Sequence, residues 1–168
     1  GIINACDPDG ASRDIYDVGL LYQTHVGDGL KWAEIVAVGI AHALCPDSSV
    51  DSVIDTVMNY AHPRITWELK RGLDIADKYD NAFDMRDDFY KIYNGGGIAY
   101  AQSWANEVVT KAFAVLKSTK GNATDAIIGA VNFGRDTDCL AAVAGGLAGA
   151  LSGVGAVRQE WIDQVDSS

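Results

Sequence analysis

One segment restricts the possible folds more than any other: residues 132–153, which read NFGRDTDCLAAVAGGLAGALSG. After two aspartates the segment is almost entirely Ala, Gly and Leu, which predicts a helix buried among other helices. Each glycine costs a helix roughly 1 kcal/mol relative to alanine, so the glycines need a packing reason. Gly145, Gly149 and Gly153 recur at every fourth position. We expect this stripe to let another helix approach closely.

The rest of the chain has helical periodicity and no alternation of apolar and polar residues typical of a half-buried strand. No internal repeat or domain boundary is visible, so we expect one compact, multi-helix, all-α domain over residues 1–168. The expected helices span about 9–22, 28–44, 50–61, 65–76, 84–93, 100–116, 126–131 and 154–166, and the glycine-rich helix follows the loop at Asp136. Asp28 is the expected cap of the second helix.

Asp136 and Asp138 are candidate metal ligands at the start of the glycine-rich helix. Within a helix, positions i and i+2 point to nearly opposite sides. The two carboxylates can converge on one ion if Asp136 lies in the loop or at the N-cap and Asp138 in the first turn. A helix start also favours acidic side chains in its own right, so simple capping remains the alternative.

The run Gly-Arg-Asp-Thr-Asp-Cys over residues 134–139, followed by the Ala- and Gly-rich helix, resembles the C-terminal signature of the ADP-ribosylglycohydrolase family. The resemblance implies an all-α fold and hydrolysis of a glycosidic bond of ADP-ribose or of an ADP-ribosylated substrate. It also implies two Mg²⁺ ions, with Mn²⁺ possible, and makes Asp136, Asp138 and position 139 metal ligands. The two aspartates are then also the candidate catalytic residues.

Two positions depart from the family's Gly-Gly-Asp-Thr-Asp-Thr pattern. Cys139 stands where the family has threonine, and a thiol is a poor ligand for the hard Mg²⁺ ion. Either this contact is lost, or the metal differs, or water replaces the ligand. Arg135 stands where the family has glycine, and we expect it to line the ligand with Gly134. A structural salt bridge is the alternative role for Arg135.

Two further segments resemble family loops and occur in the expected order. Residues 23–29, QTHVGDG, resemble a Thr-His loop, which makes His25 a candidate contact of ADP-ribose. Residues 95–99, GGGIA, resemble a glycine-rich turn, which makes Gly97 and Ile98 candidate substrate contacts. A structural histidine and a flexible glycine connection are the alternatives.

The resemblance covers only the C-terminal portion of the family's fold. The family's Thr-Asp-Asp segment, which brings further metal ligands, and its Gly-rich Met-Arg loop have no counterpart in this sequence. A two-metal site holds its ions roughly 3.5–4 Å apart, and two aspartates are too few for both. We therefore expect a further N-terminal segment or a second chain to complete the site.

Composition narrows the classes of partner. A net charge of −10 is compatible with cation binding and argues against a nucleic-acid backbone or an anionic membrane. The 3 cysteines lack metal-type spacing, which argues against a disulfide framework and favours a reducing, cytoplasmic compartment. Residues 140–157 are apolar apart from Ser152, but their Ala and Gly content indicates a buried helix rather than a membrane span.

Glu107 is an acidic residue within the apolar helix expected over 100–116. An ion pair with Lys111 at i+4 is the main expectation, and a place facing the site is the alternative.

Three functions therefore remain open. The first is the hydrolase, acting on ADP-ribose or on another N- or O-glycoside. The second is a non-catalytic module that binds ADP-ribose or metal, in which Cys139 in place of threonine indicates that catalysis was lost. The third is a helical interaction subunit.

Overall fold

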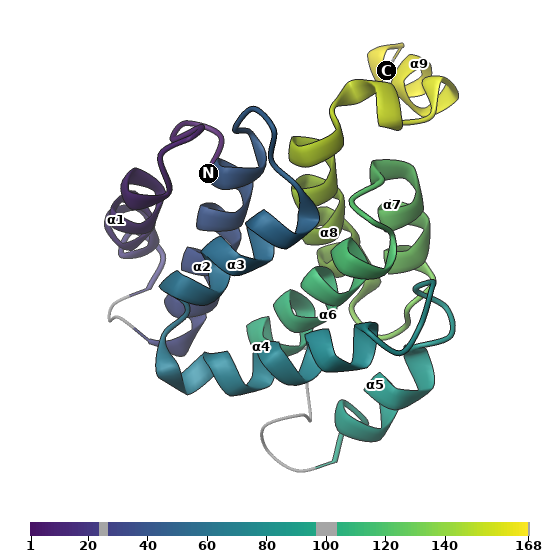
Figure 1. The fold of residues 1–168 in the computed structure, drawn as a ribbon, viewed down its shortest axis with the longest axis horizontal. Helices are drawn as coiled ribbons and strands as arrows, with labels where there is room; N and C mark the ends of the chain where they lie inside the picture. The colour runs from purple at the N-terminus through teal and green to yellow at the C-terminus, as the bar shows by residue number, and fades with distance from the viewer. Residues whose placement is uncertain (24–26, 97–103, 168) are drawn as a thin grey trace.

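The computed structural model describes residues 1–23, 27–96 and 104–167. Their regular structure is entirely helical, with no strand among them, so the predicted all-α class is confirmed (Figure 1). The elements are α1 (Pro8–Gly19), α2 (Asp28–Ala43), α3 (Val50–Tyr60), α4 (Pro63–Ala76), α5 (Arg86–Ile92), α6 (Ala105–Ser118), α7 (Ala123–Val131), α8 (Thr137–Ser152), the short 3-10 helix η2 (Val154–Ala156) and α9 (Gln159–Asp166).

Helix α6 is the centre of the fold, and it packs against α2, α3, α4, α7 and α8 (Figure 1). The residues predicted to face inward are all buried: Val108, Val109, Ala112, Phe113 and Leu116. Burial extends to the opposite face, including Thr110 and Lys111, because the neighbouring helices surround α6. A helix buried on all sides has no solvent face for its charges, so these charges must pair internally.

Side-chain caps define the starts of α1, α3, α4 and α7. Ser49 caps α3 in a capping box with Ser52, and His62 caps α4 by accepting the backbone N–H of Arg64 at 3.2 Å. The expectation that Asp28 caps α2 is wrong. Gly27 occupies the N-cap position.

Asp28 is instead the first residue of α2, where its carboxylate accepts a hydrogen bond from the Lys31 ammonium at 3.0 Å. The side chain is thus engaged by a cation one turn along the helix.

A buried acid ties α1 to α2. The Glu34 carboxylate, on α2, accepts hydrogen bonds from the Ser12 hydroxyl at 2.6 Å and the Tyr16 hydroxyl at 2.5 Å, both on α1. Burial, reinforced by this hydrogen bond, raises the pKa of Tyr16 to about 12. The contact satisfies a carboxylate that would otherwise be costly to bury.

The glycine stripe of α8 is a close-packing surface at only one of its three positions. A Cβ at Gly145 would lie 2.9 Å from Ile127 of α7, whereas a Cβ at Gly149 or at Gly153 would have no neighbour within 4 Å. Gly153 has φ +72° at the end of α8, which explains a glycine there by backbone conformation. The expected close approach along the whole stripe is therefore wrong.

A tighter helix crossing lies elsewhere, where α4 meets α6. A Cβ at Gly72 would overlap the methyl group of Thr110 and lie 3.3 Å from its carbonyl oxygen. Because a threonine methyl and a helix backbone cannot move aside easily, this glycine sets the distance between the two helices.

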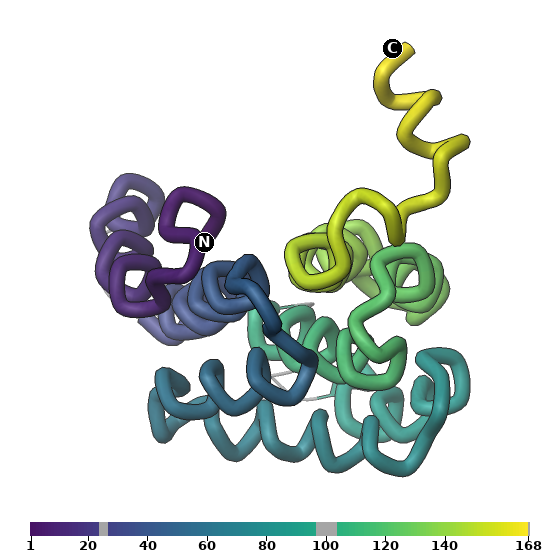
Figure 2. Tube along the Cα trace, turned by 45° about the horizontal axis from the view of Figure 1, so that its top comes forward, coloured from purple at the N-terminus to yellow at the C-terminus, as the bar shows by residue number. Residues whose placement is uncertain are grey.

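The chain leaves the helical body after α8. None of the residues of α9 is buried, and both views show this helix projecting away from the rest of the molecule (Figures 1 and 2). The single helix expected over 154–166 is two elements, η2 and α9. In the described part of the chain, no helix combines the length and apolarity needed to span a membrane.

We predict opposite effects of alanine at two helical glycines. Gly72→Ala should lower the free energy of unfolding by about 1–3 kcal/mol because it overpacks the α4–α6 crossing. Gly149→Ala meets open space, so it should raise that free energy by up to about 1 kcal/mol through helix propensity alone. Urea unfolding of both variants measures the difference. A stabilising Gly72→Ala would contradict the crossing described above.

Candidate metal centre and adjoining cavity

The loop that joins α7 to α8 presents the two aspartates. Phe133 is fully buried and anchors the loop, after which Gly134 and Arg135 both adopt left-handed backbone conformations, with φ +93° and +65°. A Cβ at Gly134 would lie 2.5 Å from the Tyr90 hydroxyl oxygen. Glycine is therefore required at 134 by both conformation and space.

A buried carboxylate holds this loop against α6. The Glu107 side chain is 2% exposed and accepts from the Lys111 ammonium at 2.6 Å and from Arg135 Nε at 2.7 Å. The predicted Glu107–Lys111 ion pair is confirmed, and the structural salt bridge considered for Arg135 is present. The same carboxylate thus pairs on its own helix and with the loop before α8.

Lys111 is more deeply buried than Arg135, the other cation that pairs with Glu107. Its ammonium lies 5.2 Å from the ring centre of Phe133 and 5.6 Å from that of Tyr93. Burial lowers the pKa of Lys111, and its carboxylate partner Glu107 opposes that shift. Asp136 also favours the charged ammonium, so its negative charge helps to balance two cations that share one buried carboxylate.

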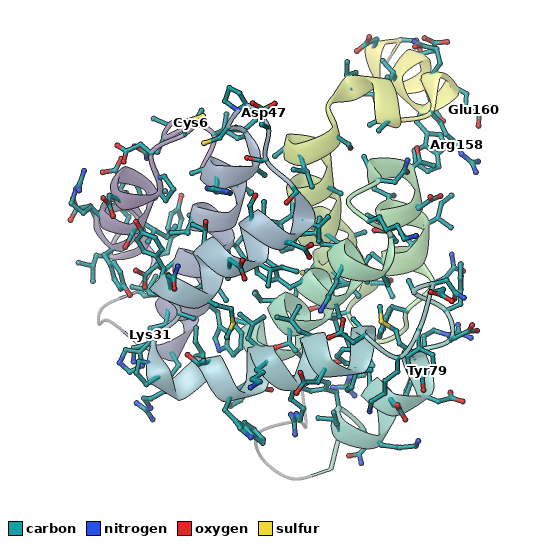
Figure 3. The ribbon with its side chains drawn as sticks, viewed as in Figure 1. Cys6, Lys31, Asp47, Tyr79, Arg158 and Glu160 are labelled. Carbon is teal, nitrogen blue, oxygen red and sulfur yellow. The ribbon has the colours of Figure 1, made fainter. Side chains whose placement is uncertain are left out.

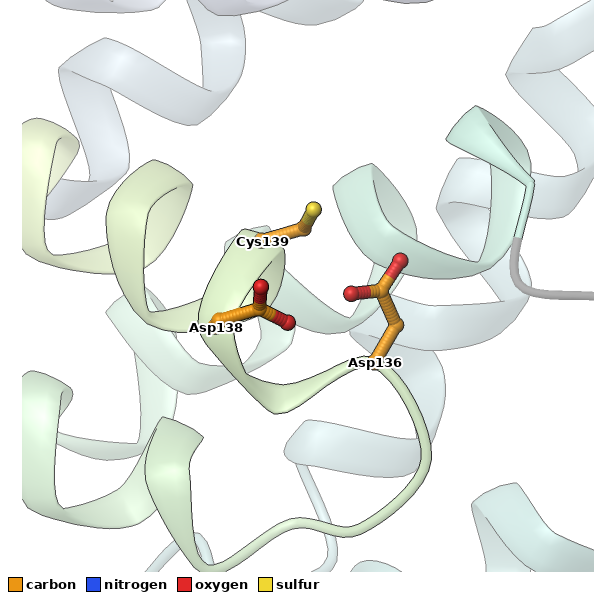
Figure 4. Close-up of side chains that lie close together, drawn as sticks. All are labelled: Asp136, Asp138 and Cys139. Atoms are coloured by element: carbon orange, nitrogen blue, oxygen red, sulfur yellow. The ribbon is translucent and has the colours of Figure 1, made fainter.

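Asp136, Asp138 and Cys139 converge at the start of α8. One ligand atom from each lies within 4.8 Å of the others, and Figure 4 shows the Asp136 carboxylate turned toward the other two side chains. Asp136 is the N-cap residue, one of the two positions expected for it, but its side chain makes no capping hydrogen bond. Capping alone therefore does not account for this carboxylate.

Hydrogen bonds within the cluster affect two pKa values. Hydrogen bonding with Asp136, and then with the backbone N–H of Cys139, lowers the pKa of Asp138. Hydrogen bonding with Asp136 raises the pKa of the Cys139 thiol, which therefore stays protonated at neutral pH. Two adjacent carboxylates repel unless a proton or a cation lies between them. The oxygen donors suit Mg²⁺ or Mn²⁺, whereas a protonated thiol is a weak ligand for either.

A cavity of about 520 Å³ adjoins this cluster, between α2, α6 and α8. Asp136 and Cys139 line it together with the apolar side chains of Ala33, Val36, Ile40, Trp104, Val108 and Val143. Its volume is within the range of small-molecule sites. The sequence predicts Val36 and Ile40 as part of a buried face, but they are only half-buried because they face this space.

A more polar hollow of about 410 Å³ shares Gly29 and Trp104 with the cavity and includes Arg64 and Glu68. These walls were missed by sequence reasoning, because helix spacing does not reveal which apolar positions border empty space. An exposed tryptophan at the N-cap of α6 is the one retrospective signal, since Trp104 is 49% exposed.

The remaining predicted site residues are His25, Gly97 and Ile98, and all three lie outside the described residues. Of the predicted set, the structure therefore brings together Asp136, Asp138 and Cys139, and places Gly134 and Arg135 immediately before them.

We predict that Glu107→Gln destabilises the fold strongly. Removing one partner of a buried ion pair costs about 3–5 kcal/mol, because uncompensated charge remains inside. The matched control is Lys91→Gln, whose ion pair with Asp88 lies on the surface and should contribute little. Chemical denaturation at neutral pH compares them. Equal, small losses would contradict the role given to Glu107.

Comparison with known proteins gives one result that bears on identity. No curated protein and no solved structure matches the chain significantly. The family model for ADP-ribosylglycohydrolases matches residues 2–167, which is nearly the whole chain and includes the aspartate cluster and the cavity walls. Sequence match and helical fold thus agree, and the chain belongs to the ADP-ribosylglycohydrolase family.

Proposed function

We propose that the protein is a metal-dependent hydrolase that cleaves a glycosidic bond of ADP-ribose or of an ADP-ribosylated substrate. The observation that carries this proposal is the convergence of Asp136, Asp138 and Cys139 beside the α2–α6–α8 cavity, in a chain of the ADP-ribosylglycohydrolase family. The family supports a glycohydrolase, and the cluster supports the metal requirement.

Asp136 and Asp138 are the proposed ligands of Mg²⁺ or Mn²⁺, because they supply two adjacent carboxylates. When bound, such an ion polarises substrate hydroxyls and activates a water molecule. Cys139 carries a proton at neutral pH and contributes no strong bond to a hard cation. Two carboxylates are too few for a pair of ions, so we infer that further ligands come from another segment or a second chain.

Glu107 and Arg135 are proposed to position Asp136. Arg135 holds a left-handed conformation directly before Asp136, and its ion pair with the buried Glu107 carboxylate fixes the loop to α6. Asp136 and Asp138 are the proposed catalytic carboxylates, because they converge beside the cavity. A carboxylate within reach of the substrate can serve as general acid or base.

The α2–α6–α8 cavity is the proposed substrate site. Its apolar walls and the exposed Trp104 ring suit the flat face of a nucleobase. Gly134 and Arg135 directly precede Asp136, which lines the cavity, and they remain proposed substrate contacts through the family resemblance. His25, Gly97 and Ile98 remain proposed substrate contacts through the family resemblance.

We predict that Asp138→Asn abolishes metal binding with little effect on the fold. The complete wild-type protein should give a calorimetric signal with Mn²⁺ or Mg²⁺ and a rise in Tm, both absent in the variant. Asp125→Asn is the matched control, because Asp125 is likewise a first-turn helix acid but lies outside the cluster. If neither ion gives heat or a rise in Tm with the wild-type protein, the metal site is excluded. Extensive unfolding of Asp138→Asn would instead favour a capping role for Asp138.

We further predict release of ADP-ribose by the complete protein in Mg²⁺ or Mn²⁺. Chromatography of the products from ADP-ribosylated protein, nucleotide and nucleic acid measures it. Asp136→Asn should lower the rate by more than about 100-fold, the usual upper range for residues that only support a metal ligand. Metal binding without release from any of these substrates would favour a binding module or a hydrolase of another glycoside.

A further inference from the structure

The C-terminal end of α2 brings two cysteines together. The last carbonyl groups of a helix lack helical partners. The backbone N–H of Cys45 bonds to the His42 carbonyl at 2.9 Å rather than to Ala41. The Ala41 carbonyl instead accepts the backbone N–H of Cys6 at 2.9 Å and the Cys45 thiol at 3.8 Å. The Ala41 carbonyl oxygen at the end of α2 thus accepts hydrogen bonds from both cysteines.

The position of Cys6 is fixed by more than this contact. Cys6 has a left-handed φ of +61°, and the next residue, Asp7, caps α1 through the backbone N–H of Gly10. Figure 3 shows Cys6 next to Asp47, which follows Cys45 by two residues. The loop before α1 and the loop after α2 therefore meet at this end of the molecule.

The two thiols are close enough to interact directly. Hydrogen bonding with the Cys6 thiol, together with burial, raises the pKa of Cys45 to about 11. Cys6 is exposed to solvent and Cys45 is half-buried. Cys139, in contrast, lies on α8 beside two carboxylates. The chain thus contains an accessible thiol with a second thiol next to it, which is the arrangement of a redox pair.

We propose that Cys6 and Cys45 are a reversible redox pair that closes to a disulfide on reaction with a small-molecule disulfide such as oxidised glutathione. This inference does not depend on the proposed hydrolase function, because neither cysteine belongs to the aspartate cluster or lines the α2–α6–α8 cavity.

The reaction proceeds by two thiol–disulfide exchanges. The exposed Cys6 thiolate attacks oxidised glutathione, forms a mixed disulfide and releases one glutathione. The Cys45 thiolate then attacks the Cys6 sulfur, the mixed S–S bond breaks, and the second glutathione leaves as a thiolate that takes up a proton. In total, the two protein thiols lose two electrons and two protons, and the small disulfide is reduced to two thiols.

Closure would fasten the loop before α1 to the end of α2, and so add a covalent tie to the Glu34 contacts between these helices. A disulfide between residues 6 and 45 also closes a long loop, which restricts the unfolded chain. The oxidised protein should therefore have a higher Tm than the reduced protein.

The test is oxidation of the reduced 168-residue chain with oxidised glutathione. Free thiols should fall from 3 per chain, the number of cysteines, to one. The intact mass should decrease by two hydrogens with no glutathione retained, and peptide mapping without reductant should recover Cys6 linked to Cys45. Tm should rise and return to its starting value with dithiothreitol.

Two variants separate this pair from general thiol reactivity. Cys45→Ser should trap glutathione on Cys6, because the attacking thiol is gone. Cys139→Ser, the matched control, should form the same internal link as wild type. Wild-type protein that keeps glutathione on Cys6, links through Cys139, or forms disulfides only between chains would overturn the proposal.

Discussion

The buried carboxylate of Glu107 is the interaction on which the arrangement of the site depends. It accepts from Lys111 on its own helix and from Arg135 in the loop before α8, at a depth where an unpaired charge would be costly. Because α6 is surrounded by other helices, these charges are balanced by one another and by Asp136 nearby. The central helix and the start of α8 are therefore fixed together electrostatically.

This arrangement explains why the aspartates converge. The left-handed Arg135 turns the chain so that Asp136 reaches the N-cap of α8 with its side chain directed at Asp138 and Cys139 instead of at the helix backbone. The same turn places Asp136 and Cys139 on the wall of the α2–α6–α8 cavity. A cation-binding group and an apolar space thus adjoin one another, as the proposed cleavage of a nucleotide-containing substrate requires.

The sequence was most informative where the physical signal is local. Helical periodicity located most of the helices to within a few residues, and the Asp-x-Asp spacing indicated that Asp136 lies in the loop or at the N-cap, where the structure places it. Glycine spacing misled, because it does not show what lies opposite. A Cβ at Gly145 would meet α7 and one at Gly149 would meet open space, while a tighter crossing uses the isolated Gly72. The cysteine count argued against a disulfide framework but gave no sign that Cys6 and Cys45 meet.

By itself, then, the sequence determined the all-α class, the family and the pair of aspartates, since each rests on neighbouring residues or on a contiguous motif. Only the tertiary structure decided that Glu107 serves Lys111 and Arg135 at once, that Val36 and Ile40 border a cavity, and that the Ala41 carbonyl joins two cysteines 39 positions apart (Cys6 and Cys45). The physical reason is that these contacts join segments distant along the chain. Packing sets their distances, and no local pattern encodes which side chain will lie opposite another.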